Sequence, residues 1–423
     1  LLGWSSLFTD AATEMIYPLL PVYLSRVLGA GALSLGIIEG VAEAINSVLK
    51  VVSGYLSDRW TRRRPIVIAG YTVSSAARPF IALTATWPQV LLVRALDRMG
   101  KGIRGAPRDA MLARFASPSD RGRIFGFHRA MDHAGAIVGP LVASAILLAA
   151  PGELRLVFAL TIVPGAIAVA LLFLVPEPEA AGPLRGTRPT YEESAHGGVP
   201  RGGAEETHIG RVPRGAAEEA PSGPAGTSAF ARLPKRLLAF LAVLLLFSLG
   251  NSADAFLLLR VSEALGSATY IPLLWSAFHV VKASLSTGGG ALSDRLGRRQ
   301  VIVIGWTVYA VVYLGFALAE GAAALVGWFL IYGVYFALTE GAEKALVADL
   351  TPAGAHGTAF GLYNAALGAG TLAASIAFGV LYERFGAAAA FGTGSALAAA
   401  AAIVLLLIRT DKQQDAMMVG SNV

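Results

Sequence analysis

Apolar residues are gathered into long blocks along this chain, and polar residues into the short connections between them. Each block holds about 20 to 30 residues, enough for a helix that rises 1.5 Å per residue to cross a hydrocarbon core of about 30 Å. The pattern therefore predicts an all-α integral membrane protein with twelve transmembrane helices. They are expected at residues 3–28, 34–57, 65–86, 88–113, 121–149, 153–175, 235–263, 269–292, 300–319, 322–349, 355–383 and 386–409.

The composition excludes an ordinary soluble protein. Hydrophobic residues fill 55% of the 423 positions and charged residues only 15%, against about 25% in soluble domains. The first apolar block is not expected to be a signal peptide, because it contains Asp10 and Glu14 and lacks both a basic start and a small-residue cleavage pattern. We interpret it as the first spanning helix.

One stretch interrupts the apolar blocks near the middle of the chain. Residues 177–233 are rich in Gly, Pro, Ala, Glu and Arg and show little apolar periodicity, so they cannot bury enough surface to fold alone. The sequence therefore predicts an N-terminal six-helix bundle at 1–176, a disordered cytoplasmic linker at 177–233, a C-terminal six-helix bundle at 234–411 and a cytoplasmic tail at 412–423.

Arginines cluster in alternate connections between the predicted helices. These clusters comprise Arg59, Arg62, Arg63 and Arg64, then Arg114, Arg121 and Arg123, and finally Arg295, Arg298 and Arg299. The connections at 85–88 and 319–321 carry no Lys or Arg. Since cytoplasmic loops carry the excess of basic residues, both termini and the linker are predicted to be cytoplasmic in the inner (plasma) membrane. The net charge of +6 is thus attributed to topology, and nucleic acid is not an expected partner.

A short basic sequence occurs twice. Gly-Tyr-Leu-Ser-Asp-Arg at 54–59 and Gly-Ala-Leu-Ser-Asp-Arg at 290–295 are each followed by further arginines. Residues 110–126 and 345–361 align at a similar offset of about 235 positions. The chain is therefore expected to consist of two related six-helix halves.

These repeats resemble the major facilitator superfamily, in which two six-helix halves enclose a substrate site near mid-membrane. The family signature between the second and third helices combines glycine, aspartate and basic residues. Both copies carry it, with Thr61 at a usual glycine of the first copy. The resemblance implies that these residues latch the two halves in one conformation: Gly54, Asp58, Arg59, Arg62, Arg63, Gly290, Asp294, Arg295, Arg298 and Arg299.

The fifth predicted helix carries a second resemblance. Gly126, Gly135, Gly139 and Pro140 are similar to the antiporter signature of the same superfamily. Small residues let helices approach closely, and a proline bends a helix. The resemblance implies efflux by exchange. Without it, the same spacing of small residues is also typical of a seam where two helices pack closely.

Ionisable residues inside the predicted helices are candidate coupling and substrate groups, because charge at this depth costs several kcal/mol unless it is paired or faces water. Arg94 resembles the arginine of the family's fourth-helix motif, and Arg98 replaces one of its glycines. Glu14 and Asp132 are the predicted proton carriers, followed by Asp10, although structural ion pairs would give the same pattern. The candidates of the N-terminal half are Asp10, Glu14, Glu43, Arg94, Asp97, Arg98, Lys101, His128 and Asp132.

The C-terminal half holds fewer such residues. Its candidates are Asn251, Asp254, His279 and Lys282. Three aromatic residues are interpreted as lipid-facing or packed in the core, with substrate contact as the alternative: Trp275, Tyr332 and Tyr335. Glu343 and Lys344 are interpreted as members of an ion pair between helices.

The sequence contains no nucleophile–base motif, phosphate-binding loop or histidine pair at metal spacing, and it has no cysteine. We therefore expect no enzyme, no cofactor and no metal site. The expected function is secondary active transport by alternating access, in which protons drive efflux of a small polar, charged or metal-chelating molecule or drug. A proton-coupled uptake symporter and a non-transporting sensor or assembly protein remain alternatives. The expected partners are a small-molecule substrate, protons and the lipid bilayer, with the chain as a monomer.

Overall fold

The computed structural model describes residues 1–59, 62–115, 121–176, 233–352 and 356–408. Within these ranges the chain forms helices and turns, with no β-strand. The predicted linker, apart from Leu233, and the predicted tail lie outside the described residues.

The N-terminal half begins with a segmented helix and continues with longer ones. In chain order it contains α1 (Leu2–Ile16), η1 (Tyr17–Leu19), α2 (Leu20–Val22), η2 (Tyr23–Val27), α3 (Ala32–Arg59), α4 (Arg64–Ala77), η3 (Arg78–Leu83), α5 (Trp87–Phe115), α6 (Arg121–Ala149), α7 (Leu154–Leu160) and α8 (Ile162–Phe173). The C-terminal half contains α9 (Lys235–Gly250), α10 (Ala255–Leu265), α11 (Ile271–Leu296), α12 (Arg298–Leu318), α13 (Ala322–Leu350) and α14 (His356–Leu407).

These elements make twelve crossings among the described residues, which confirms the predicted fold class. The first crossing runs from α1 to η2, and α4 with η3, α7 with α8 and α9 with α10 make one crossing each. The α14 helix makes two, because the chain bends at Gly386, whose φ is +84°. Eight helical stretches of the described chain are long and apolar enough to span a membrane by length and composition alone. Those eight leave out α1, α5 and α11, which are shorter or richer in polar residues.

The surface of these bundles is apolar and the charge lies inside. Large side chains such as Leu83, Leu148 and Leu174 are 74%, 63% and 67% exposed. By contrast, Arg78, Arg94 and Asp97 are each only 2% exposed. This is the reverse of a soluble protein and fits a chain surrounded by lipid.

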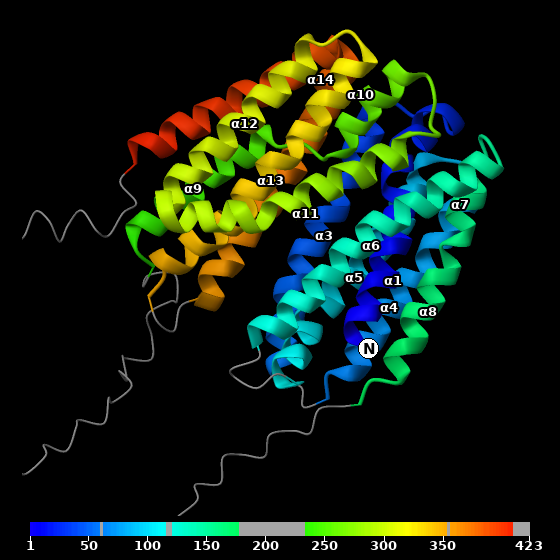
Figure 1. The fold of residues 1–423 in the computed structure, drawn as a ribbon, viewed down its shortest axis with the longest axis horizontal. Helices are drawn as coiled ribbons and strands as arrows, with labels where there is room; N and C mark the ends of the chain where they lie inside the picture. Colours follow the sequence, from blue (N-terminus) through cyan, green and yellow to red (C-terminus); the bar gives the residue numbers. More distant parts are fainter. Residues whose placement is uncertain (60–61, 116–120, 177–232, 353–355, 409–423) are drawn as a thin grey trace, which may run out of the picture.

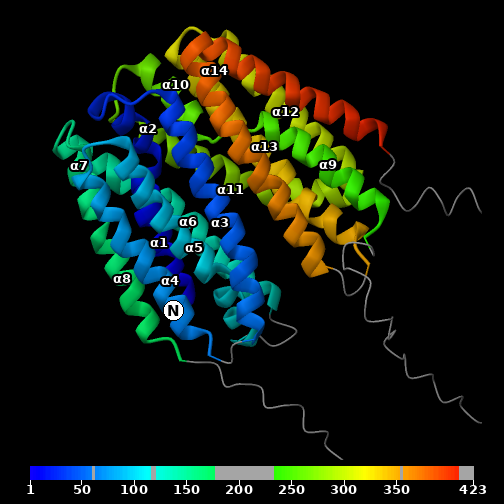
Figure 2. The same ribbon diagram turned by 180° about the vertical axis from the view of Figure 1, so that it is seen from behind.

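The two halves meet at one end and diverge toward the other (Figures 1 and 2). We name the diverging end, where α3 and α5 finish, the linker end. The opposite end, where η3 leads to α5 and α10 leads to α11, is the far end. Helices α3 and α14 pack along each other between the halves, as do α6 and α11.

Proline divides the first crossing. Pro18 and Pro21 have no N–H to donate, so the α-helix gives way to the 3₁₀ turn η1, the short α2 and the π turn η2. The π turn carries Arg26, which lies between the halves at the far end. Its guanidinium donates to the carbonyl oxygens of Ser262 at 2.8 Å and Gly266 at 2.9 Å.

A second charged side chain crosses between the halves in the reverse direction. Glu383 of α14 accepts a hydrogen bond of 3.0 Å from the backbone N–H of Leu33, in the first turn of α3. Helix starts present unpaired N–H groups and helix ends unpaired carbonyls. Each half therefore caps a helix terminus of the other half, which closes the far end.

Close backbone contact holds α1 against α6. A Cβ atom on Gly135 would lie 2.4 Å from the carbonyl oxygen of Leu7, and one on Gly139 would lie 2.3 Å from that of Ala11. The buried Pro140 lies within α6. The small residues that resemble an antiporter signature therefore form a packing seam inside the N-terminal half.

We expect Gly139→Ala to destabilise the protein, because the added methyl group cannot fit beside the Ala11 carbonyl without moving α1. Overpacking of this kind costs about 1–3 kcal/mol. Thermal unfolding of the purified protein in detergent measures the loss. Gly327→Ala in α13 is the matched control, since a Cβ there meets nothing within 4 Å. Equal melting temperatures for the two variants would contradict the seam.

We expect Arg26→Ala combined with Glu383→Gln to open the far end. Each lost cap costs about 1 kcal/mol, so the closed population should fall by roughly 30-fold relative to the open one. Because the chain has no cysteine, Val27→Cys and Ala264→Cys can be spin-labelled directly, and the label-to-label distance should lengthen.

Glu320→Gln is the control for this experiment, because Glu320 is an exposed carboxylate of the same far end. An unchanged distance distribution in the Arg26 and Glu383 double variant would show that the caps do not hold the far end closed.

Candidate functional site

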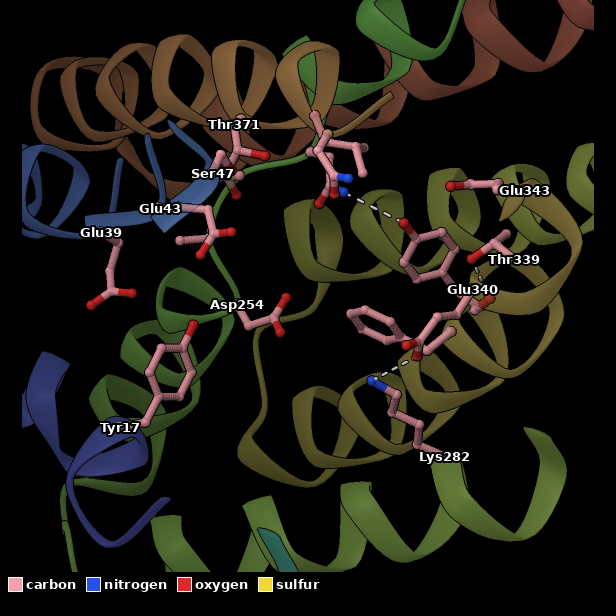
Figure 3. Close-up of a pocket in the computed structure, with 18 of the residues that line it drawn as sticks. Tyr17, Glu39, Glu43, Ser47, Asp254, Lys282, Thr339, Glu340, Glu343 and Thr371 are labelled. Carbon is pink, nitrogen blue, oxygen red and sulfur yellow. Dashed lines mark hydrogen bonds and ion pairs between the residues drawn. The ribbon is translucent and has the colours of Figure 1, made fainter. Parts of the chain in front are cut away.

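A cavity of about 520 Å³ lies between the two halves (Figure 3). Residues of α1, η1, α3 and α5 form one wall, and residues 251–254 between α9 and α10, together with residues of α11, α13 and α14, form the other. Among its lining groups, Glu340 and Lys344 have side chains 37% and 44% exposed, so the cavity reaches solvent beside them. The far end above the cavity is closed by the reciprocal caps.

Regular helix periodicity explains how the lining groups reach the cavity. On α11, Trp275, Phe278, His279 and Lys282 follow the i, i+3, i+4, i+7 spacing of one helix face. The same logic places Glu39, Glu43, Ser47 and Lys50 on the cavity face of α3.

The seventh crossing is broken where it meets the cavity. Residues 251–253 between α9 and α10 are not helical, and Asn251, Ser252, Ala253 and Asp254 line the cavity. Non-helical backbone at membrane depth is tolerated where it lines a cavity. Asp254 accepts a 2.7 Å hydrogen bond from the Tyr332 hydroxyl, and Figure 3 shows Asp254 near the middle of the pocket, opposite Tyr17.

Behind the N-terminal wall, Asp97 of α5 is the centre of a buried ionic cluster. Its carboxylate lies 2.9 Å from Arg78, 3.5 Å from Arg94 and 4.0 Å from Arg98. Arg78 also donates to the Thr9 carbonyl oxygen at 3.3 Å, which connects α1 to the cluster. A buried charge is tolerated only when it is paired and hydrogen-bonded, and this geometry meets that condition for Asp97.

Arg94 links this cluster to α3. Its guanidinium donates to Glu39 at 2.8 Å and 3.2 Å, and it lies 5.8 Å from the centre of the Tyr17 ring. Arg94 and Asp97 therefore support the cavity from behind, whereas Glu39, Tyr17 and Arg98 line it.

A direct polar contact joins the two halves at the cavity. The indole N–H of Trp275 in α11 donates to the Glu14 carboxylate of α1 at 2.7 Å. The Trp275 ring also lies 5.1 Å from the Tyr17 ring, centre to centre. Glu14 is thus held by a neutral donor from the opposite half.

The structure brings most of the predicted site residues into this cavity. Those that line it are Glu14, Glu43, Arg98, Lys101, Asn251, Asp254, His279 and Lys282. Asp10, Arg94, Asp97, His128 and Asp132 are not among the lining residues.

Asp132 belongs to a separate polar group on α1 and α6. It accepts a hydrogen bond of 2.5 Å from the Ser6 hydroxyl and lies 3.5 Å from His128. Arg108 of α5 donates to the same Ser6 hydroxyl at 3.2 Å. Asp132 can therefore exchange a proton with the cavity only through intervening groups or movement of the helices.

Of the paired basic signatures, the second is described in full and connects helices of its own half. Arg298 pairs with Asp294 and lies 3.6 Å from Asp349 of α13. Arg299 donates to the backbone carbonyl oxygens of Leu405 and Leu406 in α14. Arg295 is exposed, and Gly290 is half-buried. In the first copy the side chains of Asp58 and Arg59, together with Gly54, lie outside the described part, while Arg62 is exposed.

Several lining groups differ from the sequence-based interpretation. Trp275 and Tyr335 line the cavity, which agrees with the alternative of substrate contact and not with the favoured assignment to packing. Glu343 accepts hydrogen bonds from Trp306 at 3.0 Å and Tyr363 at 3.1 Å, and Lys344 pairs with Glu340, so Glu343 and Lys344 do not form the expected pair. The partners of Glu343 are uncharged aromatic side chains, so the positions of charged residues in the sequence could not reveal them.

Sequence reasoning also missed Arg78, Ser47 and Lys50. Arg78 is an arginine inside a predicted membrane-spanning helix, and that signal alone could have marked it as a partner for a buried carboxylate. Lys50 follows Glu39 and Glu43 on the same face of α3, so the helical period of those two acids pointed to it.

Comparison with known proteins decides the family. The sequence profile of the Major Facilitator Superfamily matches residues 2–261 and 238–416. The chain belongs to the Major Facilitator Superfamily. An uncharacterized MFS-type transporter, MJ1317 of Methanocaldococcus jannaschii, is 32% identical over 389 residues, which cover 90% of this chain and 88% of that protein.

Two further matches are a multidrug resistance protein and a solved sugar transporter. Multidrug resistance protein MdtH of Photorhabdus laumondii is 31% identical over 134 residues, 31% of this chain and 33% of that protein. A solved D-xylose-proton symporter shares the fold at 15% identity, with a TM-score of 0.69 and 96% of each chain covered. The chain is therefore a multi-pass membrane transporter of two six-helix bundles rather than an enzyme, and a small-molecule substrate and the lipid bilayer are its partners.

We expect Asp97→Asn to destabilise the N-terminal half strongly. The change leaves the buried Arg78 guanidinium without its ion pair, and breaking a buried pair costs about 3–5 kcal/mol. Thermal unfolding of the purified transporter measures this loss. Asp109→Asn is the control, because the Asp109 side chain is 53% exposed beside Arg108. A melting temperature for Asp97→Asn as high as that of the control would contradict the central role of Asp97.

Proposed function

We propose that this transporter exports a small charged solute in exchange for protons by alternating access. The observation that carries the proposal is the cavity between the halves, which is closed at the far end and lined by charges of both signs. In this cycle, the two predicted bundles, at 1–176 and 234–411, would move relative to each other. Under the topology predicted from the arginines, the linker end faces the cytoplasm, so the cavity is accessible from inside the cell.

Proton coupling is assigned first to Glu14. The ionised carboxylate accepts a charge-assisted hydrogen bond from Trp275 of the other half, and such bonds are about twice as strong as neutral ones. A proton on Glu14 weakens this contact between α1 and α11. Protonation of Glu14 therefore weakens one of the contacts between the halves, so the charge of Glu14 and the closure of the far end are linked.

Asp132 and Asp10 are assigned supporting roles as proton carriers beside the cavity. Asp10 lies on α1 one turn from Glu14, and Asp132 faces α1 through the Ser6 hydroxyl. Because α1 packs closely on α6 at Gly135 and Gly139, movement of α1 would change the surroundings of all three carboxylates.

Two observations favour export over uptake. The seam of Gly135, Gly139 and Pro140 resembles an antiporter signature, and part of the chain is similar to a multidrug resistance protein. Uptake symport is the second candidate, since a proton symporter shares the fold. The direction of flux under a known pH gradient distinguishes them.

We expect Glu14→Gln to reduce pH-driven accumulation about tenfold or more, because glutamine cannot take up a proton and its amide oxygen accepts only a neutral hydrogen bond from Trp275, weaker by about 1.4 kcal/mol. Exchange of labelled for unlabelled substrate without a gradient should continue, since it needs no net proton movement. Solutes found by a thermal-shift screen of carboxylates, amino acids and amines are then followed in everted vesicles with an acid interior. Accumulation indicates export, and depletion indicates uptake.

Asp132→Asn should show the same loss of pH dependence, and Glu320→Gln at the far end is the control. Normal pH dependence in both Glu14→Gln and Asp132→Asn would overturn the coupling assignment. If no solute of the screen moves in wild-type vesicles in either direction, the transport proposal itself fails.

A further inference from the structure

The carboxylates that line the cavity are all occupied by donors of the protein itself. Each of the six accepts a hydrogen bond or ion pair from a described side chain. The pairs are Glu14 with Trp275, Glu39 with Arg94, Glu43 with Asn46, Asp254 with Tyr332, Glu340 with Lys282, and Glu343 with Trp306. Each lining carboxylate therefore already has a hydrogen-bond or ion-pair partner within the protein, although four of these six partners are neutral and leave its charge in place.

The cations of the N-terminal wall are in the opposite situation. Lys50 and Lys101 line the cavity and form an ion pair with none of the described carboxylates. Arg98 has Asp97 at 4.0 Å, but that carboxylate is closer to Arg78 and Arg94. Lys50 and Lys101 thus have no ion-pair partner among the described residues and Arg98 shares a distant one, in a partly enclosed cavity where electrostatic attraction is stronger than in bulk water.

Helix packing groups these three cations. Arg98 and Lys101 are three residues apart on α5, so they share a face. A Cβ atom on Gly102 would lie 2.6 Å from that of Leu49, which brings α3 against α5 at the level of Lys50 and Lys101. The Ser53 hydroxyl donates to the Gly102 carbonyl oxygen at 2.8 Å and fixes this contact. An acidic group between the cations relieves their mutual repulsion.

The opposite wall adds aromatic rings to its charged residues. Trp275 and Phe278 stack at 5.0 Å between ring centres, and Phe278 lies 5.8 Å from Phe336 in an edge-to-face arrangement. Tyr335 adds a further ring 4.8 Å from Phe336. The C-terminal half therefore offers ring faces and edges, which favour a planar aromatic group over a purely aliphatic one.

A buried histidine provides a polar contact on this aromatic wall. His279 is 9% exposed, lines the cavity, and has no hydrogen-bond partner at either ring nitrogen among the described residues. Its ring packs edge-on against Trp275 at 4.9 Å. Since buried polar groups are rarely left unpaired, His279 points to a hydrogen bond with a bound ligand.

We infer that the substrate is a small aromatic organic anion. Its acidic group lies against Arg98, Lys101 and Lys50, and its ring packs on Trp275 and Phe278 with a polar substituent at His279. A cavity of about 520 Å³ is within the range of roughly 300–1,000 Å³ for small-molecule sites. That the bound anion is also transported rests on the proposed function. Its binding does not, because binding can be measured without transport.

Binding of matched probes to the purified full-length chain tests the inference. The probes are phenylacetate, its neutral amide phenylacetamide, the amine phenethylamine and the non-aromatic cyclohexylacetate, followed by 4-hydroxybenzoate and indole-3-acetate as further ring carboxylates. Calorimetry and quenching of tryptophan fluorescence measure affinity. Phenylacetate should bind at least tenfold tighter than the amide and tighter than cyclohexylacetate, and the amine should bind weakest.

Two variants assign the contacts. Lys101→Gln should lower the affinity for phenylacetate at least tenfold without changing that for the amide, whereas Lys235→Gln, at the exposed start of α9, should change neither. Phe278→Leu should reduce the preference for phenylacetate over cyclohexylacetate. Equal binding of acid and amide, tighter binding of the amine, or no saturable binding of any ring carboxylate would overturn the inference.

The two proposals fail in different ways. Gradient-driven flux of an amine or a neutral solute would support proton-coupled transport and overturn the aromatic anion. Lys101-dependent binding of ring carboxylates without flux of any probe would support the site and overturn the transport proposal.

Discussion

The buried carboxylate of Asp97 is the interaction on which the N-terminal half depends. In a protein surrounded by lipid, three arginines and an aspartate can be buried together only if their charges and hydrogen bonds are matched. Arg78 and Arg94 take the closest positions on Asp97, and Arg94 is neutralised further by Glu39. Arg98 is left with the most distant position, on the side that lines the cavity. The positive character of the cavity wall therefore follows from how one carboxylate is shared.

The two halves share a scaffold but use different chemistry. The buried polar core of the N-terminal half centres on ion pairs, whereas that of the C-terminal half centres on rings and hydroxyl groups. Phe247 stacks on Trp306 at 4.4 Å, and Tyr309 stacks on Tyr313 at 4.1 Å. The Tyr313 hydroxyl shares a 3.0 Å hydrogen bond with Ser252 in the broken seventh crossing. A duplicated fold thus gives the cavity a charged N-terminal wall and a C-terminal wall in which aromatic rings stand beside charged residues.

The number and order of the crossings could be predicted from the sequence because apolar length is a property of each segment alone. The block predicted at 34–57, for example, is α3 at Ala32–Arg59. Partners between helices could not be predicted in this way, since periodicity reports which face is polar but not what it meets. Asp132 and Glu14 are both carboxylates inside predicted spanning helices, and the sequence does not tell them apart. In the structure, Glu14 lines the cavity and Asp132 contacts Ser6. The pairing of Arg78 with Asp97 likewise depends on the packing of η3 against α5.

The contacts between the halves differ in how easily they can break. The seam of α3 and α14 is a close backbone contact, with a Cβ on Gly36 only 2.2 Å from the Ser375 carbonyl oxygen, and it joins groups that need not separate if the bundles rock about it. The polar contacts of Arg26, Glu383 and Glu14 join groups that must part for the far end to open. Two of these three are helix caps at the far end, whereas Glu14 lies at the cavity and accepts a hydrogen bond from Trp275 alone among the described side chains. Opening therefore breaks all three contacts, and Glu14 is the one of them whose charge a proton can neutralise within the cavity.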